Sequence, residues 1–242
     1  MTKEKTGLAR KIFLLLAALF ITSLVVSNLI FQKFFYWYPF DIEIFGVKLF
    51  ELSVGILPYP ITFLITDLIS EIYGKKKANE VVLVGIFASI FSISILLVSN
   101  YVPAIENSPV DDKTFNNVFS NSPLAVLASM ISYLLAQLID IRIYHFWKNL
   151  TKGKHLWLRN NFSTFTSQFI DSFSVIFFLT IFQILDWSQF VGLVFSAFIF
   201  KILVAAFDTP FLYILVGIFR KKFNLKINEE IDIDNEYDKR SN

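Results

Sequence analysis

The chain has 242 residues, of which 55% are hydrophobic and 17% aromatic, and its mean hydropathy is +0.59. This composition excludes an ordinary soluble domain and indicates an integral membrane protein. The chain contains no cysteine, which excludes disulfides, thiol catalysis and cysteine-ligated metals. The formal net charge is only +2, so the placement of the charges is more informative than their sum.

Six long apolar stretches follow one another along the chain. Each is long enough to cross about 30 Å of hydrocarbon as a helix, which takes roughly 20 residues. They predict an all-α integral membrane protein with six transmembrane helices. The stretches lie near residues 12–32, 49–73, 81–102, 123–146, 162–185 and 188–219.

The Lys and Arg residues are concentrated in alternate connections between these stretches. Eighteen of the 22 lie before the first stretch, in or at the edge of the second and fourth connections, or after the last stretch. The other connections hold only Lys33, Lys48 and Lys113, and Lys201 lies inside the last stretch. Since positive charge is retained on the cytoplasmic side during insertion, both termini are predicted to be cytoplasmic.

Glycine and proline predict irregularities in two of the spans. Gly55, Pro58 and Pro60 divide the second span into a short leading segment and a helix. Before this span, apolar residues alternate around Gly46, which predicts a small hairpin on the outer side. In the sixth span Pro210 lacks a backbone donor and predicts a kink beside Asp208.

The chain is predicted to form one membrane domain with a short tail. Residues 1–222 contain all six spans and form the six-helix membrane domain. Residues 223–242 carry six acidic side chains among polar residues, which is typical of a disordered segment, here on the cytoplasmic side.

Five carboxylates and one amine lie within the helical parts of the spans. Each charged group near the bilayer centre costs roughly 2.5–3.5 kcal/mol on insertion scales, so such residues usually face an interior and serve a function. The alternative is that they only hold helices together by hydrogen bonds, a role that rarely needs so many carboxylates. The six residues are Asp67, Glu71, Asp140, Asp171, Lys201 and Asp208.

Helical periodicity places most of these residues on polar stripes. At about 100° per residue, three spans each present one narrow small-or-polar face, which predicts a shared polar interior. Asp171 and Lys201 lie at similar depths on adjacent antiparallel spans, so they are expected to pair. The stripes are Ser129, Tyr133, Ala136 and Asp140 with Gln137 at the edge; Thr164, Ser167, Gln168, Asp171 and Ser174; and Lys201, Ala205 and Asp208.

Sequence motifs for the common enzyme classes are absent. The chain has no G-x-x-x-x-G-K-[ST] phosphate loop, no H-E-x-x-H and no G-x-S-x-G, so no enzyme activity, metal or cofactor is expected. An intramembrane enzyme that uses Asp140 and Asp171 is an alternative. It is disfavoured because the Gly-x-Gly-Asp context of intramembrane aspartyl proteases is missing.

Four motifs lie within the spans: residues 66–74 (TDLISEIYG) followed by KKKA, residues 136–140 (AQLID), residues 167–172 (SQFIDS), and residues 201–210, which begin with Lys201 and end in DTP. Together and in this order they resemble the motifs of the queuosine precursor transporter family, also called the vitamin uptake transporter group. The resemblance covers roughly residues 12–220.

The resemblance implies a multi-pass protein of the bacterial inner membrane that imports 7-deazaguanines such as preQ0 or preQ1 for tRNA modification. It implies an architecture similar to the substrate-binding subunits of energy-coupling-factor importers, but without a dedicated ATPase. The alternative is a substrate-capture subunit that needs a separate ATPase partner. The expected partners are the small-molecule base and the lipid bilayer. No nucleic-acid contact is expected, and the oligomeric state stays open.

The polar residues of the spans suit recognition of such a base. A carboxylate accepts paired hydrogen bonds from a ring N–H and an exocyclic amine, and a glutamine amide both accepts and donates. Gln137 with Asp140, and Gln168 with Asp171, are spaced i, i+3 and lie side by side on a helix. The candidate substrate-binding residues are Asn28, Asp67, Glu71, Gln137, Asp140, Gln168, Asp171, Lys201 and Asp208.

Overall fold

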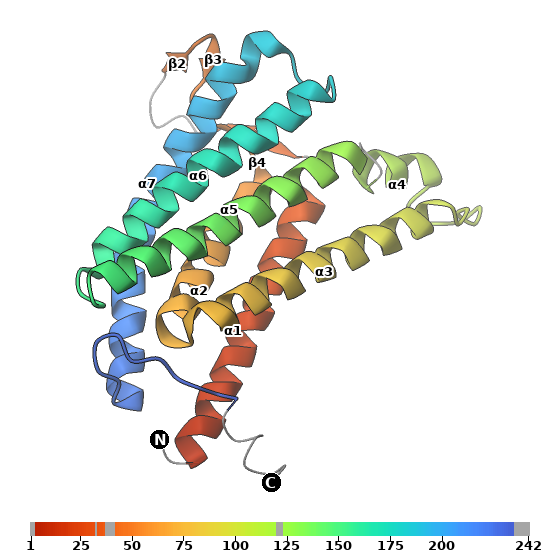
Figure 1. Ribbon diagram of the computed structural model, residues 1–242. Helices are drawn as coiled ribbons and strands as arrows, with labels where there is room; N and C mark the ends of the chain where they lie inside the picture. The colour runs from red at the N-terminus through yellow and green to blue at the C-terminus, as the bar shows by residue number, and fades with distance from the viewer. Residues whose placement is uncertain (1–2, 32, 37–41, 120–122, 235–242) are drawn as a thin grey trace.

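The structure, a computed structural model, describes residues 3–31, 33–36, 42–119 and 123–234 of the chain. Within these ranges the fold is a bundle of long helices with short strands at one end (Figure 1). The helices are α1 Lys3–Ile30, α2 Tyr59–Ile72, α3 Gly74–Asn100, α4 Asp112–Phe119, α5 Pro123–Leu150, α6 Leu156–Ile181 and α7 Trp187–Phe223.

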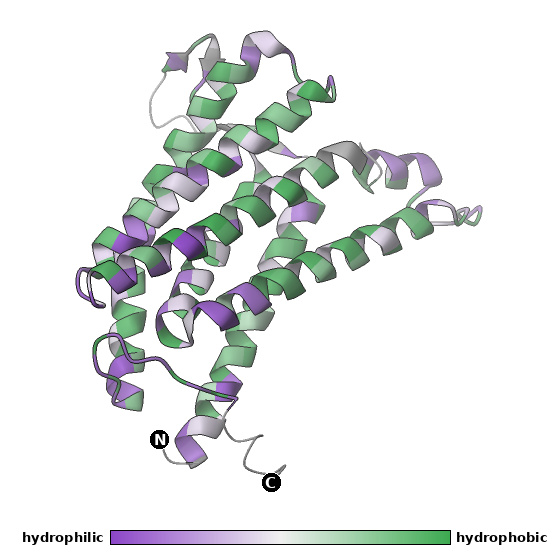
Figure 2. Cartoon of the chain, in the orientation of Figure 1, coloured by the Kyte–Doolittle hydropathy of each residue, from purple (hydrophilic) through white to green (hydrophobic). Residues whose placement is uncertain are grey.

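Six segments within the described residues are helical, long and apolar enough to cross a membrane. They are α1, α2 together with the short 3₁₀ helix η1 (Val54–Ile56) that precedes it, α3, α5, α6 and α7. Figure 2 shows that hydrophobic residues dominate the middle of the long helices, whereas hydrophilic residues gather toward their ends. The prediction of six spans is therefore confirmed. The short helix α4, in the third connection, was not predicted.

The central element of the bundle is α2. Its residues from Ile65 to Ile72 are all buried, and α1, α3, α5 and α7 pack around it. The two ends of the bundle differ (Figure 1). We call the end that holds both termini and the α2–α3 turn the terminal end, and the end that holds the strands the hairpin end. Polar residues on α2 therefore have helices on every side.

The strands form two small antiparallel pairs at the hairpin end. Strand β1 (Phe34–Tyr36) pairs with β4 (Glu51–Ser53), and β2 (Glu43–Ile44) pairs with β3 (Val47–Lys48). Phe45 and Gly46 connect β2 to β3 with φ angles of 50° and 77°. Two consecutive positive φ angles are typical of the type I′ turn that suits a two-residue hairpin. The predicted hairpin around Gly46 is thus confirmed.

The leading segment of the second span packs closely on α1. Gly55 is buried, and its carbonyl accepts a hydrogen bond from the Ser27 hydroxyl of α1. A Cβ atom at Gly55 would lie 2.7 Å from the Ser27 carbonyl oxygen, so only glycine permits this approach. Pro60 lies in the first turn of α2, where its missing N–H costs no helical bond. The predicted division of the span is confirmed.

The sixth span is continuous through its proline. Helix α7 runs from Trp187 to Phe223 with Pro210 inside it. Thr209 donates its side-chain hydroxyl to the Ala205 carbonyl at 3.0 Å. The helix continues past Asp208 to Arg220 at the terminal end, and no segment is unwound at the proline.

The segment after α7 differs from the predicted disordered tail over residues 224–234. Ile231 donates its backbone N–H to the Ile72 carbonyl at 2.7 Å, and the side chains of Ile231 and Ile233 are buried. Ile231 and Ile233 supply apolar surface that is buried on docking, and the acidic residues around them had suggested a wholly polar segment. Residues 235–242 lie outside the described residues.

Docking of this segment predicts protection of its backbone. Replacing Ile231 with Ala removes buried apolar volume, typically worth about 2 kcal/mol or more, so the Ile231 amide should exchange at least about tenfold faster. Hydrogen exchange of the purified protein measures this rate. Ile227→Ala is the matched control, because Ile227 is 59% exposed. Equal exchange in the wild type and both variants would show that the segment is not docked.

Candidate functional site

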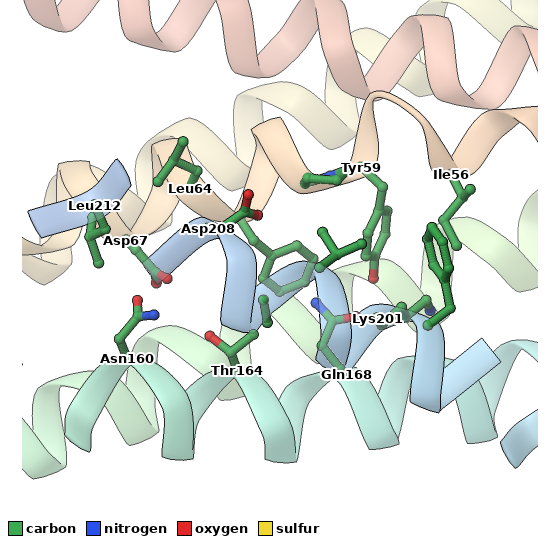
Figure 3. A pocket seen from close by; sticks show the side chains of 15 residues that line it. Ile56, Tyr59, Leu64, Asp67, Asn160, Thr164, Gln168, Lys201, Asp208 and Leu212 are labelled. Carbon is green, nitrogen blue, oxygen red and sulfur yellow. The ribbon is translucent and has the colours of Figure 1, made fainter. Parts of the chain in front are cut away.

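A polar crevice lies between α2, α6 and α7 (Figure 3). The open space within it is narrow, about 20 Å³, which is room for roughly one water molecule. Helix α6 provides three amide or hydroxyl side chains, whereas α2 and α7 provide aromatic rings, carboxylates and one amine. The polar and aromatic residues that line the crevice are Tyr59, Phe63, Asp67, Asn160, Thr164, Gln168, Phe200, Lys201 and Asp208.

The α6 wall of the crevice carries buried acceptors without donors. Asn160, Thr164 and Gln168 follow one another at intervals of four residues and therefore lie on one helix face. Asn160 Oδ1, Thr164 Oγ1 and Gln168 Oε1 are all buried and make no hydrogen bond in the structure. A buried polar atom without a partner is costly, so this row of atoms is suited to a ligand that brings hydrogen-bond donors.

The end of the crevice nearer the hairpin end contains an ion pair. Lys201 of α7 forms a hydrogen-bonded ion pair with Asp171 of α6, and both side chains are at least nine-tenths buried. The Tyr59 hydroxyl of α2 donates to the same Asp171 carboxylate at 2.5 Å. The Lys201 amine also lies 4.8 Å from the centre of the Tyr59 ring, a distance typical of a cation–π contact. The pairing predicted from matching depths is confirmed.

Toward the terminal end, the crevice contains carboxyl groups without a cation. Asp67 of α2 and Asp208 of α7 both line it, and Asp140 of α5 is buried beside Ser167 of α6. In the described part of the chain, no Lys, Arg or His nitrogen lies within 4.0 Å of any of these three carboxylates. Asp140 Oδ1 accepts a hydrogen bond from the Ser167 hydroxyl at 2.8 Å.

Glu71, one turn after Asp67, has the opposite environment. Arg159 and Arg220 approach its Oε1 at 2.7 and 2.5 Å, and Lys148 approaches its Oε2 at 3.7 Å. Lys148 also donates to Glu230 at 2.7 Å. We call Glu71, Lys148, Arg159, Arg220 and Glu230 the Glu71 cluster. It joins α2, α5, α6, α7 and the C-terminal segment.

The structure brings together most of the residues predicted from the sequence. Asp67, Gln168, Lys201 and Asp208 line the crevice, and Asp171 contacts the lining residues Tyr59 and Lys201. Asp140 accepts a hydrogen bond from Ser167, the neighbour of Gln168 on α6. Gln137 is held by protein partners: its Oε1 accepts from Thr66, and its Nε2 donates to the Tyr133 hydroxyl at 2.8 Å.

Two further predicted residues, like Gln137, do not line the crevice. Asn28 of α1 donates to the Ser89 hydroxyl of α3 at 3.4 Å, so it joins two helices. Glu71 is enclosed by the cations of its cluster. Neither lines the crevice in this conformation, and their assignment as substrate-binding residues has no support from the geometry.

Sequence reasoning missed Tyr59 and Asn160 as lining residues and missed Lys148 and Arg159 as buried cations. Arg159 is completely buried and Lys148 is 1% exposed, although both were assigned to a loop. For Asn160 a signal existed, since it continues the spacing of Thr164 and Gln168 by one more turn. The cations gave no such signal, because basic residues beside a span usually face water.

The described ion pair predicts a characteristic stability pattern. Lys201→Met leaves the Asp171 charge buried without its partner, which typically costs about 3–5 kcal/mol. Adding Asp171→Asn to Lys201→Met should therefore recover much of that loss. Thermal unfolding in detergent measures both variants, with Lys33→Met as the control because Lys33 is exposed. Strictly additive losses from the two changes would mean that the residues do not stabilise each other.

Comparison with known proteins gives a family. A family model described as "Putative vitamin uptake transporter" matches residues 53–215. A "Probable queuosine precursor transporter" of Bacillus subtilis (strain 168) is 25% identical over 175 residues, which are 71% of this chain and 73% of that protein. A protein of the same description from Haemophilus influenzae (strain ATCC 51907 / DSM 11121 / KW20 / Rd) is 24% identical over 218 residues, which are 83% of this chain and 86% of that protein.

No solved structure gives a significant match to the chain. The family match is nevertheless extensive, since it begins in β4 and continues through α2, α3, α5 and α6 into α7. It includes every residue that lines the crevice. The chain belongs to the vitamin uptake transporter family, a family of membrane transporters rather than of enzymes.

Proposed function

We propose that this protein imports queuosine precursors, 7-deazaguanine bases such as preQ0 and preQ1, across the bacterial inner membrane for tRNA modification. Two relatives are described as probable queuosine precursor transporters, and both come from bacteria. The proposed substrate is a planar, donor-rich small molecule. The crevice between α2, α6 and α7 is its proposed binding site.

The observation that carries this proposal is the row of unpartnered acceptors on α6. A deazaguanine presents a ring N–H beside an exocyclic amine on one edge and a pyrrole N–H on another. Gln168 Oε1, Thr164 Oγ1 and Asn160 Oδ1 offer acceptors along the crevice for such donors. Each hydrogen bond would satisfy an atom that is otherwise buried without a partner, which favours a donor-bearing ligand over a purely apolar one.

The opposite walls suit the flat face of the base. Tyr59 and Phe63 of α2 have ring centres 5.0 Å apart, and Phe200 of α7 lines the same space. Aromatic rings provide apolar contact area and favourable stacking for a planar ligand. Because the crevice is narrow, a base enters only when these side chains or their helices move apart, as alternating access in transporters requires.

The orientation of the crevice fits import. From the hairpin end to the terminal end, it runs from Tyr59 and Lys201 to Asp67 and Asn160 (Figure 3). By the positive-inside rule the terminal end faces the cytoplasm. A base that enters from outside would thus first pass the end of the crevice with Tyr59 and the Lys201–Asp171 pair and then bind at Gln168. Before its release inside, it would pass the end with Asp67 and Asp208.

Replacing Gln168 with Ala tests the site. The change removes the Gln168 Oε1 acceptor, and loss of one buried hydrogen-bond partner typically costs about 1–3 kcal/mol, or roughly tenfold in affinity. In a strain that cannot make the precursor, Gln168→Ala should lower tRNA queuosine at limiting external preQ0 or preQ1. The host should also lack energy-coupling-factor ATPases, so that a capture-subunit function would fail to rescue.

Gln189→Ala serves as the matched control, because it makes the same change at an exposed position of α7. Membrane levels of each variant are compared by immunoblot. Normal queuosine with Gln168→Ala at low external base would contradict the proposed site. Absence of rescue by the wild-type protein in this host would contradict autonomous import.

A further inference from the structure

One part of the crevice contains carboxylates that the protein itself does not neutralise. We call the part lined by Asp67 of α2, Asn160 of α6 and Asp208 of α7 the acidic end. Within the described residues, no Lys, Arg or His nitrogen lies within 4.0 Å of either carboxylate. Asp67 is only 4% exposed, and a buried carboxylate without a partner is costly. The acidic end is therefore suited to a positively charged group.

The buried cations of the bundle are paired with other carboxylates. In the part of the chain that the structure describes, the buried Lys and Arg side chains are Lys201, which pairs with Asp171, Arg159, which pairs with Glu71, and Lys148, which pairs with Glu230. Since each of them already has a carboxylate partner, a cation for the acidic end has to be supplied by a ligand or by solution.

A second observation at the acidic end is a buried acceptor that lacks a donor. Asn160 is 4% exposed, and its Oδ1 makes no hydrogen bond. Its Nδ2 donates to the Thr209 hydroxyl at 3.2 Å, and this hydroxyl has the Ala205 carbonyl at 3.0 Å as the acceptor for its own proton. The contact with Thr209 therefore determines which side of the amide is the nitrogen and leaves Oδ1 for a ligand. Figure 3 shows Asn160 and Asp67 pointing toward one another across the crevice.

A primary ammonium group matches these acceptors. It carries one positive charge and three N–H donors and has no acceptor of its own. It can donate to Asn160 Oδ1 and to the carboxylates of Asp67 and Asp208. A hydroxyl group would bring one donor without a charge, and a nitrile would bring neither. The acidic end thus distinguishes a cationic substituent from a neutral one.

We propose that the acidic end selects 7-deazaguanines that carry an ammonium group on the substituent at position 7, such as preQ1, over neutral ones such as preQ0. This rests on the proposed function. PreQ1 carries an aminomethyl group at this position, whereas preQ0 carries a nitrile. A primary amine of this kind is protonated at neutral pH, as that of lysine is.

The length of the crevice accommodates this orientation of the base. Position 7 lies in the five-membered ring, whereas the exocyclic amine is attached to the six-membered ring. Gln168 and Asn160 are eight residues apart on α6, a separation of about 12 Å along a helix. A base whose amine edge meets Gln168 therefore directs its ammonium group toward Asn160 and the two carboxylates.

Binding of three ligands to the purified protein in lipid nanodiscs tests the selectivity. The ligands are preQ1, preQ0 and the 7-hydroxymethyl analogue of preQ1, in which a hydroxyl replaces the ammonium group at nearly the same size. A buried hydrogen bond to a charged group typically changes affinity by at least about tenfold, so the wild type should bind preQ1 at least about tenfold tighter than either neutral base. Isothermal titration calorimetry measures the dissociation constants.

Replacing Asp208 with Asn tests the residue. The amide keeps the shape of the side chain and removes its charge, so the ratio of the preQ0 to the preQ1 dissociation constant should fall below about threefold. Asp67→Asn should lower the same ratio and replaces Asp208→Asn should that variant not fold. Asp186→Asn is the matched control, because it makes the same change at an exposed position between α6 and α7 and should keep the wild-type ratio.

The outcomes separate this proposal from the proposed function. Wild-type protein that binds preQ1 no tighter than preQ0 or the 7-hydroxymethyl analogue would overturn the selectivity and leave the proposed function intact. A wild-type ratio retained in both Asp208→Asn and Asp67→Asn would overturn the assignment to the acidic end. Wild-type protein that binds none of the three bases would overturn the proposed function and, with it, the selectivity.

Discussion

The structure depends on how ionised side chains are neutralised inside an apolar bundle. Taking a charge out of water costs several kcal/mol unless a partner compensates it. Glu71 lies among three cations, and Asp171 is paired with Lys201. Asp67, Asp140 and Asp208 have no such cation within the described residues. The first group joins helices, whereas the second leaves negative charge that a proton or a ligand must offset.

The paired and unpaired charges contact α2 at successive positions along this helix. Helix α2 is the element that the others surround, and its polar residues face different neighbours at successive turns. Tyr59 contributes to the Lys201–Asp171 pair, Asp67 lines the crevice, and Glu71 is fixed by the cluster at the terminal end. The crevice thus lies between two electrostatically fixed levels. A movement that admits a base therefore has to occur between these two levels, where side chains of α2, α6 and α7 line the crevice.

Much of this arrangement was predictable from the sequence. Hydropathy gave six spans, and matched depth on antiparallel neighbours gave the Lys201–Asp171 pair. The predictions that failed first of all concerned the positions at which helices begin and end. Helix α6 begins at Leu156 rather than near residue 162, so Arg159 and Asn160 lie inside the bundle and not in a loop. Likewise, the acidic pattern after residue 222 concealed Ile231 and Ile233, whose burial depends on a surface formed by α2 and its neighbours.

The most direct test of the account is an experimental structure of the protein with preQ0 bound in lipid nanodiscs. The account predicts density for the base between α2, α6 and α7, with its donors within hydrogen-bonding distance of Gln168 and of Thr164 or Asn160. It also predicts that the Lys201–Asp171 pair remains buried beside the base. Density for the base elsewhere, for example at Asn28 between α1 and α3, with an empty crevice, would contradict it.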